Sequence, residues 1–168
     1  MKTAGTGKYD HKKLGMLRWA KEFTVILIVA IVLFRLILGI SFISGNSMHP
    51  TVKNNAPVIY WRLDKSYDRG EIVSVRMPNG EYLIKRVIAV GGDTVDVRDG
   101  AVTINGEPEQ GAYLYGTTEL PENASSYPLT VPAGHVYLLG DNREVSVDSR
   151  SYGTVSVSQI RGTILFKK

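Results

Sequence analysis

One residue of this sequence that could act as a nucleophile is a serine in a short polar loop. Ser47 lies in SGNSMHPT, residues 44–51, directly after a long apolar run. A loop that contains glycine and proline can expose a hydroxyl group and bring backbone N–H groups close to it. An acyl-transfer enzyme needs both, because the hydroxyl attacks and the N–H groups stabilise the oxyanion. Taken alone, the same serine also fits a polar cap at the end of a helix.

A lysine inside an apolar strand is the second reactive candidate. Residues 82–90 read YLIKRVIAV, and on a strand both faces of this segment are apolar apart from Lys85 and Arg86. We therefore expect a strand covered on both sides and a buried Lys85. Burial lowers the pKa of a lysine, and an amine that is neutral at about pH 7–8 can accept a serine proton. A single lysine also fits an edge strand, and Arg86 fits either that interpretation or a structural ion pair.

A polar stretch, GDNREVSVDSRSYG at residues 140–153, follows the apolar run VYLLG. Asp141, Asn142, Glu144 and Asp148 offer oxygen ligands for a cation, but their spacing does not match the EF-hand pattern. We favour a support loop, in which charged and hydroxyl groups hold a neighbouring site through hydrogen bonds.

Other kinds of hydrolytic chemistry have fewer candidates. The histidines of the sequence are His11, His49 and His135. His49 is only two residues from Ser47 and is poorly placed to act as its base. His135 remains an alternative, in a triad with Ser47 and either Asp141 or Asp148.

Several motifs are absent from the sequence. It has no HExxH motif, P-loop or GxGxxG fingerprint, and Pro50 stands where a Ser-x-x-Lys enzyme would have its lysine. It has no cysteine, which excludes disulfides, a thiolate metal site and a cysteine nucleophile. We expect neither a metal ion nor an organic cofactor.

The loop of the candidate nucleophile Ser47 follows an apolar run, which must therefore help to position it. This run reads FTVILIVAIVLFRLILGISF, residues 23–42. Twenty helical residues rise about 30 Å, the thickness of a bilayer's hydrocarbon core. Arg35 would cost roughly 2.5–3.5 kcal/mol at the bilayer centre, which its many apolar neighbours outweigh. A cleaved secretory signal is an alternative, although the run exceeds the usual length of about 7–15 residues.

The basic residues before this run predict its orientation. They are Lys2, Lys8, Lys12, Lys13, Arg18 and Lys21. By the positive-inside rule, residues 1–22 form a cytoplasmic segment, residues 23–43 a transmembrane anchor, and residues 44–168 an extracytoplasmic catalytic domain. This arrangement predicts a single-pass protein of the cell membrane.

After Pro50, short β-branched runs separated by turns predict a β domain. The expected strands are 58–62, 72–76, 82–90, 94–98, 101–104, 135–139 and 163–166. Asp99-Gly100 predicts a two-residue hairpin. Residues 107–132, rich in proline, glycine, serine and tyrosine, predict a long surface excursion. The fold class is therefore mostly β, with one N-terminal transmembrane helix followed by one compact, mainly antiparallel domain.

Four segments, in this order behind one anchor, resemble the bacterial type I signal peptidases. The small size of the chain and its single anchor resemble the Gram-positive form of that family. They are SGNSMHPT at 44–51, RGEIV at 69–73, YLIKRVIAVGGD at 82–93 and GDNREVSVDSRSYG at 140–153. The resemblance implies a membrane-bound serine endopeptidase that removes N-terminal signal peptides from exported preproteins and cuts after small residues. It also implies a β domain of the signal-peptidase type whose groove binds the leader peptide as an extended strand.

The resemblance implies a Ser-Lys dyad, with Ser47 as nucleophile and Lys85 as general base and later acid. The residues that match the supporting polar network of the family are Ser146, Asp141, Asp148 and Arg150. Met48 matches the nucleophile loop. Some members carry a hydroxyl residue where this sequence has Gly45, so the oxyanion hole would rest on backbone N–H groups, chiefly that of Ser47.

The implied partners are preprotein signal peptides and the lipid bilayer, with a secretion or pilus-assembly machinery as a further expectation. No nucleic-acid partner is expected, because no aromatic-basic interleaving or groove-reading motif follows the basic tail. Self-cleaving repressors share the dyad but need a DNA-binding domain. An alternative of another class is a non-catalytic membrane-tethered assembly factor or peptide-binding chaperone on the same fold. Such a protein would be expected to lack Ser47 or Lys85, and both are present.

Overall fold

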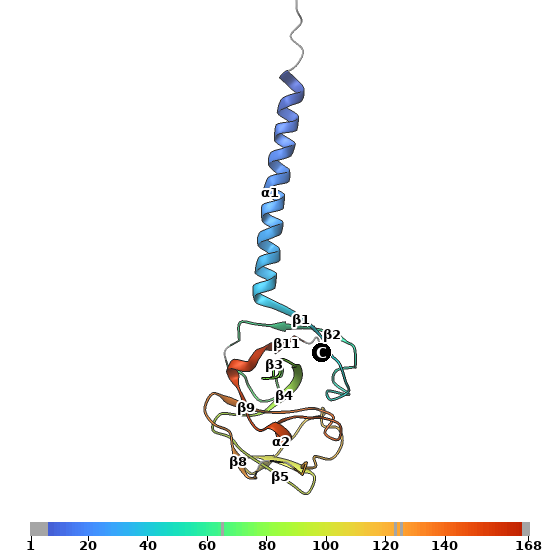
Figure 1. The fold of residues 1–168 in the computed structure, drawn as a ribbon, viewed down its shortest axis with the longest axis vertical. Coiled ribbons are helices and arrows are strands. Elements are labelled where there is room, and N and C mark those ends of the chain that lie inside the picture. Colours follow the sequence, from blue (N-terminus) through green and yellow to red (C-terminus); the bar gives the residue numbers. More distant parts are fainter. Residues whose placement is uncertain (1–6, 65, 123, 125, 166–168) are drawn as a thin grey trace, which may run out of the picture. The chain divides into compact units, whose positions relative to one another are not determined.

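The structure is a computed structural model that describes residues 7–64, 66–122, 124 and 126–165 of the chain. It divides into two compact units, Met1–Ile37 and Leu38–Lys168. The first unit contains one long helix and the second contains the strands (Figure 1).

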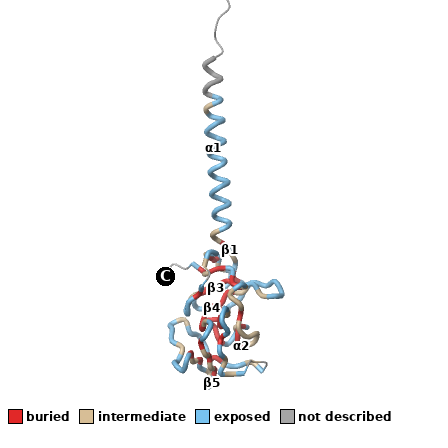
Figure 2. The backbone as a smooth tube through the Cα atoms, turned by 90° about the vertical axis from the view of Figure 1, so that its left-hand side faces the viewer, coloured by how far each residue is buried: buried red, intermediate tan, exposed pale blue. Residues whose placement is uncertain are grey.

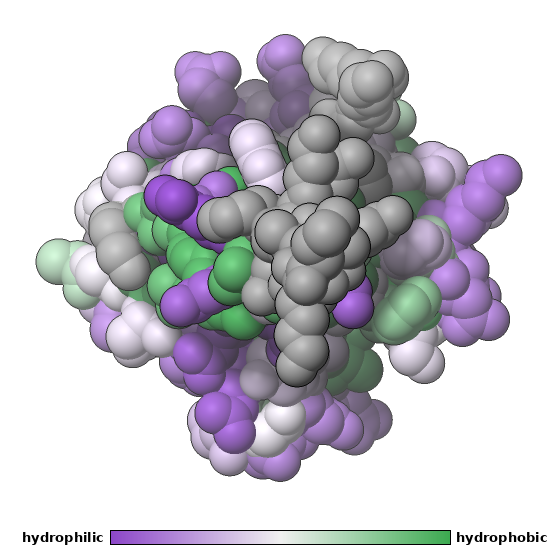
Figure 3. All heavy atoms as spheres, turned by 90° about the horizontal axis from the view of Figure 1, so that it is seen from above, coloured by the Kyte–Doolittle hydropathy of each residue, from purple (hydrophilic) through white to green (hydrophobic). Residues whose placement is uncertain are grey.

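The helix of the first unit, α1, runs from Gly7 to Ile37. Its sequence contains no proline, and its apolar side chains between Phe23 and Leu36 are exposed rather than packed against a core (Figure 2). A space-filling view from above shows a group of apolar side chains left of the centre, with hydrophilic side chains around most of the edge (Figure 3). Within the described residues, no helix combines the length and the apolar character that crossing a membrane requires.

The prediction that a helix extends over residues 23–43 is wrong at its C-terminal end. The helix ends at Ile37, and Leu38–Phe42 form strand β1, which pairs antiparallel with β2, Pro57–Trp61. A Cβ atom on Gly39 would lie 2.1 Å from the ring of Tyr60, so glycine is what lets this tyrosine pack against β1. Long-range pairing therefore overrides the apolar helical pattern in these five residues.

Two antiparallel sheets make up the second unit. The larger has the order β1-β2-β11-β3-β4-β9-β10 and the smaller has the order β7-β6-β5-β8. The remaining strands of the larger sheet are β3 (Ile72–Arg76), β4 (Tyr82–Val90), β9 (His135–Leu139), β10 (Val155–Ser156) and β11 (Ile160–Ile164). The smaller sheet contains β5 (Thr94–Arg98), β6 (Ala101–Ile104), β7 (Glu107–Pro108) and β8 (Leu129–Thr130). Two short helices complete it, α2 (Ser149–Tyr152) and the 3₁₀ turn η1 (Val157–Gln159).

Most predicted strands are confirmed. Those at 72–76, 82–90, 94–98, 101–104 and 135–139 have the expected bounds, and the strand expected at 58–62 begins and ends one residue earlier, at Pro57–Trp61. The strand expected at 163–166 overlaps the observed Ile160–Ile164, which pairs with both β2 and β3, and residue 166 lies outside the described residues. Asp99 and Gly100 have positive φ values of 49° and 75° between β5 and β6, as the hairpin prediction requires.

Strand β4 lies at the centre of the core. Ile84 packs in one apolar cluster, Val87 in a second, and Ile88 with Ala89 in a third. The strand is therefore covered on both faces, as its sequence predicts. Each fully buried aliphatic side chain contributes roughly 1.5–3 kcal/mol relative to an exposed one, so β4 forms a rigid base for the polar residue between them, Lys85.

Candidate active site

Ser47 lies in a turn that is fixed to the core. The neighbouring side chain of Met48 is fully buried, and Val52 packs in the same apolar cluster. The N–H of Val52 donates to the carbonyl of Met48 at 2.8 Å. The N–H of His49 donates to the carbonyl of Asn46 at 3.1 Å. Because the residues around Ser47 are held in this way, its position is set by the backbone.

Gly45 adopts a conformation that other residues rarely adopt, with a φ of +105°. Its N–H donates to Oδ1 of Asn54 at 2.9 Å and is therefore already engaged. By contrast, the N–H of Ser47 forms no hydrogen bond within the described part of the chain. Of these two backbone donors in the nucleophile loop, only the second is free.

Lys85 is buried as the strand pattern predicts, with a relative exposure of 2%. Burial lowers the pKa of its amine to about 8, from 10.5, because the charged form loses its hydration. Asp148 and Asp141 act in the opposite direction and favour the ammonium form, while Arg150 adds to the lowering. The alternative of an edge-strand lysine that reaches solvent is therefore wrong.

Ser47 and Lys85 line the same small cavity, which has a volume of about 40 Å³. Its walls come from two segments, residues 41–44 at the end of β1 and residues 82–85 of β4. A space of this size admits a water molecule or a small side chain but no large one. The fold thus brings the two reactive candidates, 38 positions apart in the sequence, to one enclosed place.

Gly140 is the point at which the nucleophile loop meets the polar stretch 140–153. A Cβ atom on Gly140 would lie 2.2 Å from Oγ of Ser146 and 2.5 Å from the carbonyl oxygen of Ser47. Only glycine leaves room for both groups. The Oγ atom of Ser146 is itself buried and has no hydrogen-bond partner among the described residues. A buried hydroxyl without a partner is costly, so it marks a site where another polar group is expected to bind.

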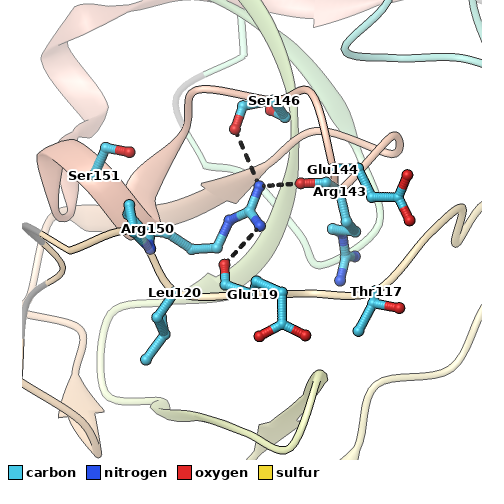
Figure 4. Close-up of a pocket in the computed structure, with 9 residues that line it drawn as sticks. Thr117, Glu119, Leu120, Arg143, Glu144, Ser146, Arg150 and Ser151 are labelled. Atoms are coloured by element: carbon cyan, nitrogen blue, oxygen red, sulfur yellow. Dashed lines mark hydrogen bonds between the residues drawn. The ribbon is translucent and has the colours of Figure 1, made fainter.

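An ion pair between Asp148 and Arg150 holds the backbone around Ser146. Asp148 caps α2 and accepts from Nε of Arg150 at 2.8 Å. The guanidinium also donates to the carbonyl oxygens of Arg143 at 2.7 Å and Ser146 at 3.1 Å. Figure 4 shows it reaching these two carbonyls and that of Glu119, beside a pocket of about 530 Å³. Charge-assisted bonds of this kind are stronger than neutral ones, so this loop is well fixed.

A second buried ion pair links the strand of Lys85 to the same stretch. Arg86 donates to Asp141 through two bonds of 2.8 and 2.7 Å. Its guanidinium lies 3.9 Å from the ring centroid of Tyr113, and the hydroxyl of Thr51 donates to Asp141. The interpretation of Arg86 as one member of a structural ion pair is confirmed.

Some residues of this site were missed by sequence reasoning. The buried side chain of Arg143 donates to Oε1 of Glu109 at 2.6 Å, to Oγ1 of Thr118 at 2.9 Å and to the carbonyl oxygen of Gly140 at 3.0 Å. The buried Oγ of Ser149 accepts from the N–H of Leu138. A basic residue within a polar loop is a signal for a structural role, but nothing in the sequence pairs Arg143 with Glu109.

The remaining alternatives from the sequence have little structural support. Asp141 and Asp148 are each bound to an arginine, so neither is free to complete a triad with His135. The ring of His135 instead lies 3.3 Å from the carbonyl oxygen of Ala133. Among the residues that the structure describes, no three histidine, aspartate or glutamate side chains gather in a way that could hold a metal ion.

Comparison with known proteins identifies the family of the chain. The family model described as "Signal peptidase, peptidase S26" matches residues 16–167. Signal peptidase IB of Staphylococcus aureus strain Mu50 is 30% identical, over 92% of this chain and 90% of that protein. Signal peptidase I S of Bacillus subtilis strain 168 is 32% identical, again over 92% of this chain and 90% of that protein. The crystal structure of a signal peptidase I from Enterococcus faecalis V583 is 30% identical, with a TM-score of 0.48, and covers 58% of this chain and 96% of that one.

The match to the family model and to the proteins of Staphylococcus aureus and Bacillus subtilis defines the class of this protein as a serine peptidase. The chain belongs to the signal peptidase I family, peptidase S26.

Proposed function

We propose that this type I signal peptidase works through a dyad in which Ser47 is the nucleophile and Lys85 the general base. The observation that carries the proposal is that a lysine with 2% exposure lines the same cavity as the serine. With its pKa lowered to about 8, a useful fraction of this amine is neutral near neutral pH and can take the serine proton. The resulting ammonium group then returns the proton to the leaving amine.

The surrounding residues support this chemistry by position. The unpartnered Oγ of Ser146 lies beside Gly140, which also borders the carbonyl of Ser47, and we assign to this hydroxyl the role of orienting the lysine when substrate is bound. Arg150 and Asp148 keep that hydroxyl in place through the loop backbone. The free N–H of Ser47 serves as the backbone donor to the oxyanion, since the N–H of Gly45 is engaged by Asn54.

The substrate is the end of a signal peptide, bound as an extended strand. Residues 82–85 of β4 pair with β3 on one side only, because β9 pairs with β4 from Arg86 onwards. Strand β1 likewise pairs only with β2 and is an edge of its sheet. Both walls of the 40 Å³ cavity thus have an unpaired backbone edge that can bind a peptide strand. The small volume favours small side chains before the cut.

We propose that the apolar run at residues 23–42 still acts as a single-pass membrane anchor, although only its residues up to Ile37 are helical in the structure and α1 by itself does not meet the requirements of a membrane span. The N-terminus would then lie in the cytoplasm and the catalytic domain outside the cell. The support is the apolar run at residues 23–42, the basic residues before it, and the exposure of apolar side chains along α1. An anchor that directly precedes the nucleophile loop in the sequence would raise the effective concentration of substrates held in the same bilayer. The expected partners are therefore exported preproteins, the lipid bilayer and the secretion or pilus-assembly machinery that delivers the substrates.

The test is cleavage of a purified secretory precursor by the detergent-solubilised full chain, with the cut mapped by mass spectrometry. We expect cleavage after a small residue by the wild type and by Lys53→Ala, whose lysine is exposed in the loop that precedes β2. Ser47→Ala and Lys85→Ala should be inactive. Equal cleavage by Lys85→Ala would show that the base is misassigned. A wild type inert towards several precursors would favour the non-catalytic assembly factor.

A further inference from the structure

We propose that His49 and Tyr115 form the subsite for the first two residues after the cut, which belong to the mature protein. This inference rests on the proposed function, because it assumes that Ser47 attacks a peptide bound in the 40 Å³ cavity. It gives residues 107–132 a role in substrate selection.

Different parts of the chain lie on the two sides of Ser47, which we call its two flanks. Its flank towards Lys85 is the small cavity, with walls from residues 41–44 and 82–85. On its other flank, its carbonyl oxygen accepts from the N–H of Asn142 at 3.0 Å. Asn142 in turn forms a β-bridge with Tyr115. If the residues before the cut occupy the cavity, the chain after the cut leaves over this second flank.

An aromatic pair stands on the second flank. The rings of His49 and Tyr115 meet edge to face, with centroids 5.4 Å apart. Both residues are exposed, Tyr115 at 49%, so the pair offers its surface to a ligand. His49 follows Ser47 by two residues, and two residues span at most about 7 Å. An extended substrate advances about 3.3 Å per residue, so its first and second residues after the cut come within reach of this pair.

The segment that carries Tyr115 is fixed to the catalytic domain through backbone and buried contacts. We call residues 109–119 the strap. The N–H of Tyr115 donates to the carbonyl of Asp141 at 3.0 Å, and its carbonyl accepts from the N–H of Arg143 at 2.9 Å. The buried ion pair between Glu109 and Arg143 fastens one end of the strap. The Tyr115 ring is therefore presented by a rigid element, while all of these contacts are independent of the ring itself.

The same flank holds an unused hydrogen-bond acceptor. Oδ1 of Asn142 is buried and has no partner among the described residues, and the residue as a whole is 8% exposed. Because this oxygen is buried, a backbone N–H of the bound mature segment would satisfy it once the side chain turns towards the substrate. The aromatic pair and this acceptor together suit a chain whose first residues carry apolar or aromatic side chains, because ring edges and faces favour such contacts.

The experiment uses precursors that are identical up to the cut and then continue with Gly-Gly, Leu-Leu or Phe-Phe. For the wild type we expect kcat/KM to be about two- to tenfold higher for Leu-Leu and Phe-Phe than for Gly-Gly, the range expected of one or two aromatic contacts. Tyr115→Ala should lose this preference, and Tyr115→Phe, which keeps the ring, should retain it. His49→Ala should weaken it.

Two controls separate the subsite from a general effect. Tyr82 is exposed to a similar extent, 55%, but lines the cavity, so Tyr82→Ala should alter selectivity before the cut and leave the preference after it unchanged. A peptide methyl ester that ends at the cut places only a methoxy group after the scissile bond, so Tyr115→Ala should hydrolyse it at the wild-type rate. A Tyr115→Ala protein that keeps the preference, or that loses activity equally on the methyl ester, would overturn the subsite while leaving the dyad intact. If the wild type cuts none of these substrates, the proposed function fails as well.

Discussion

The carbonyl oxygen of Ser47 accepts a 3.0 Å hydrogen bond from the backbone N–H of Asn142. This bond joins the nucleophile loop, which precedes β2, to the polar stretch that follows β9. Side-chain ion pairs then hold that stretch, with Asp141 bound to Arg86 and Asp148 bound to Arg150. The relative position of nucleophile and base is thus a property of the whole β domain.

Replacement of Gly140 by alanine should abolish most activity without unfolding the protein. The added methyl group would lie 2.2 Å from Oγ of Ser146 and 2.5 Å from the carbonyl of Ser47, so both must move. A displacement of about 1 Å in an active site can reduce the rate about 10²-fold, which is the expected loss. The measurement is kcat/KM, with thermal unfolding to verify the fold. Gly15→Ala is the control, since its added Cβ meets nothing within 4 Å; equal activity in both variants would contradict the prediction.

Activity should rise with pH through a midpoint near the pKa of Lys85, about 8. The neutral amine is the active form of the base, so kcat/KM increases as the ammonium loses its proton and then reaches a plateau. The pH profile of kcat/KM on a peptide substrate measures this midpoint in the free enzyme. A midpoint between pH 6 and 7, which is typical of an unperturbed histidine, would instead point to His135.

Stability should also depend on pH through Lys85. Its pKa is lower in the folded protein, about 8, than the ordinary value of 10.5, so between these values the unfolded chain binds more protons. The contribution of Lys85 to the free energy of unfolding therefore increases as pH rises from about 8 to 10.5 and is constant below this range. Lys85→Met should remove that increase. Urea unfolding of both proteins at pH 7, 9 and 10.5 tests it, and parallel pH dependences would show that Lys85 is not responsible.

Loss of the carboxylate of Asp141 should destabilise the fold strongly. Asp141→Ala leaves the buried guanidinium of Arg86 without its partner, and breaking a buried pair in this way costs roughly 3–5 kcal/mol. Urea unfolding measures the change. Glu22→Ala breaks the exposed pair with Arg18 and should change stability by less than about 1 kcal/mol. Similar values for the two variants would mean that the Asp141 pair is well solvated in the folded protein.

Loss of the carboxylate of Glu109 should loosen the strap. Glu109→Ala leaves the buried Arg143 without its ion-pair partner, whereas Glu107→Ala removes an exposed carboxylate nearby. We expect limited proteolysis to cut within residues 109–119 at least tenfold faster in the first variant than in the second or the wild type. Equal rates of cleavage in all three proteins would show that the ion pair does not fasten the strap.

Local patterns were enough to predict much of this fold and site. The apolar residues on both faces of YLIKRVIAV predict a strand covered on both sides, and the burial of Lys85 follows directly. Turn chemistry predicts the Asp99-Gly100 hairpin, and most strand bounds follow from β-branched runs between turns. These features depend on neighbours in the sequence, where backbone preference and side-chain period act directly.

The features that failed prediction depend on partners far away in the chain. The apolar pattern around residues 38–42 continues that of the helix, yet pairing with Pro57–Trp61 makes it a strand. The strap was expected only as a surface excursion, because nothing local relates Glu109 to Arg143, 34 residues later. The sequence by itself determined that a serine loop and a buried lysine exist. Only the tertiary structure decided that they share one cavity, because that requires long-range strand pairing and buried ion pairs between segments that local patterns cannot connect.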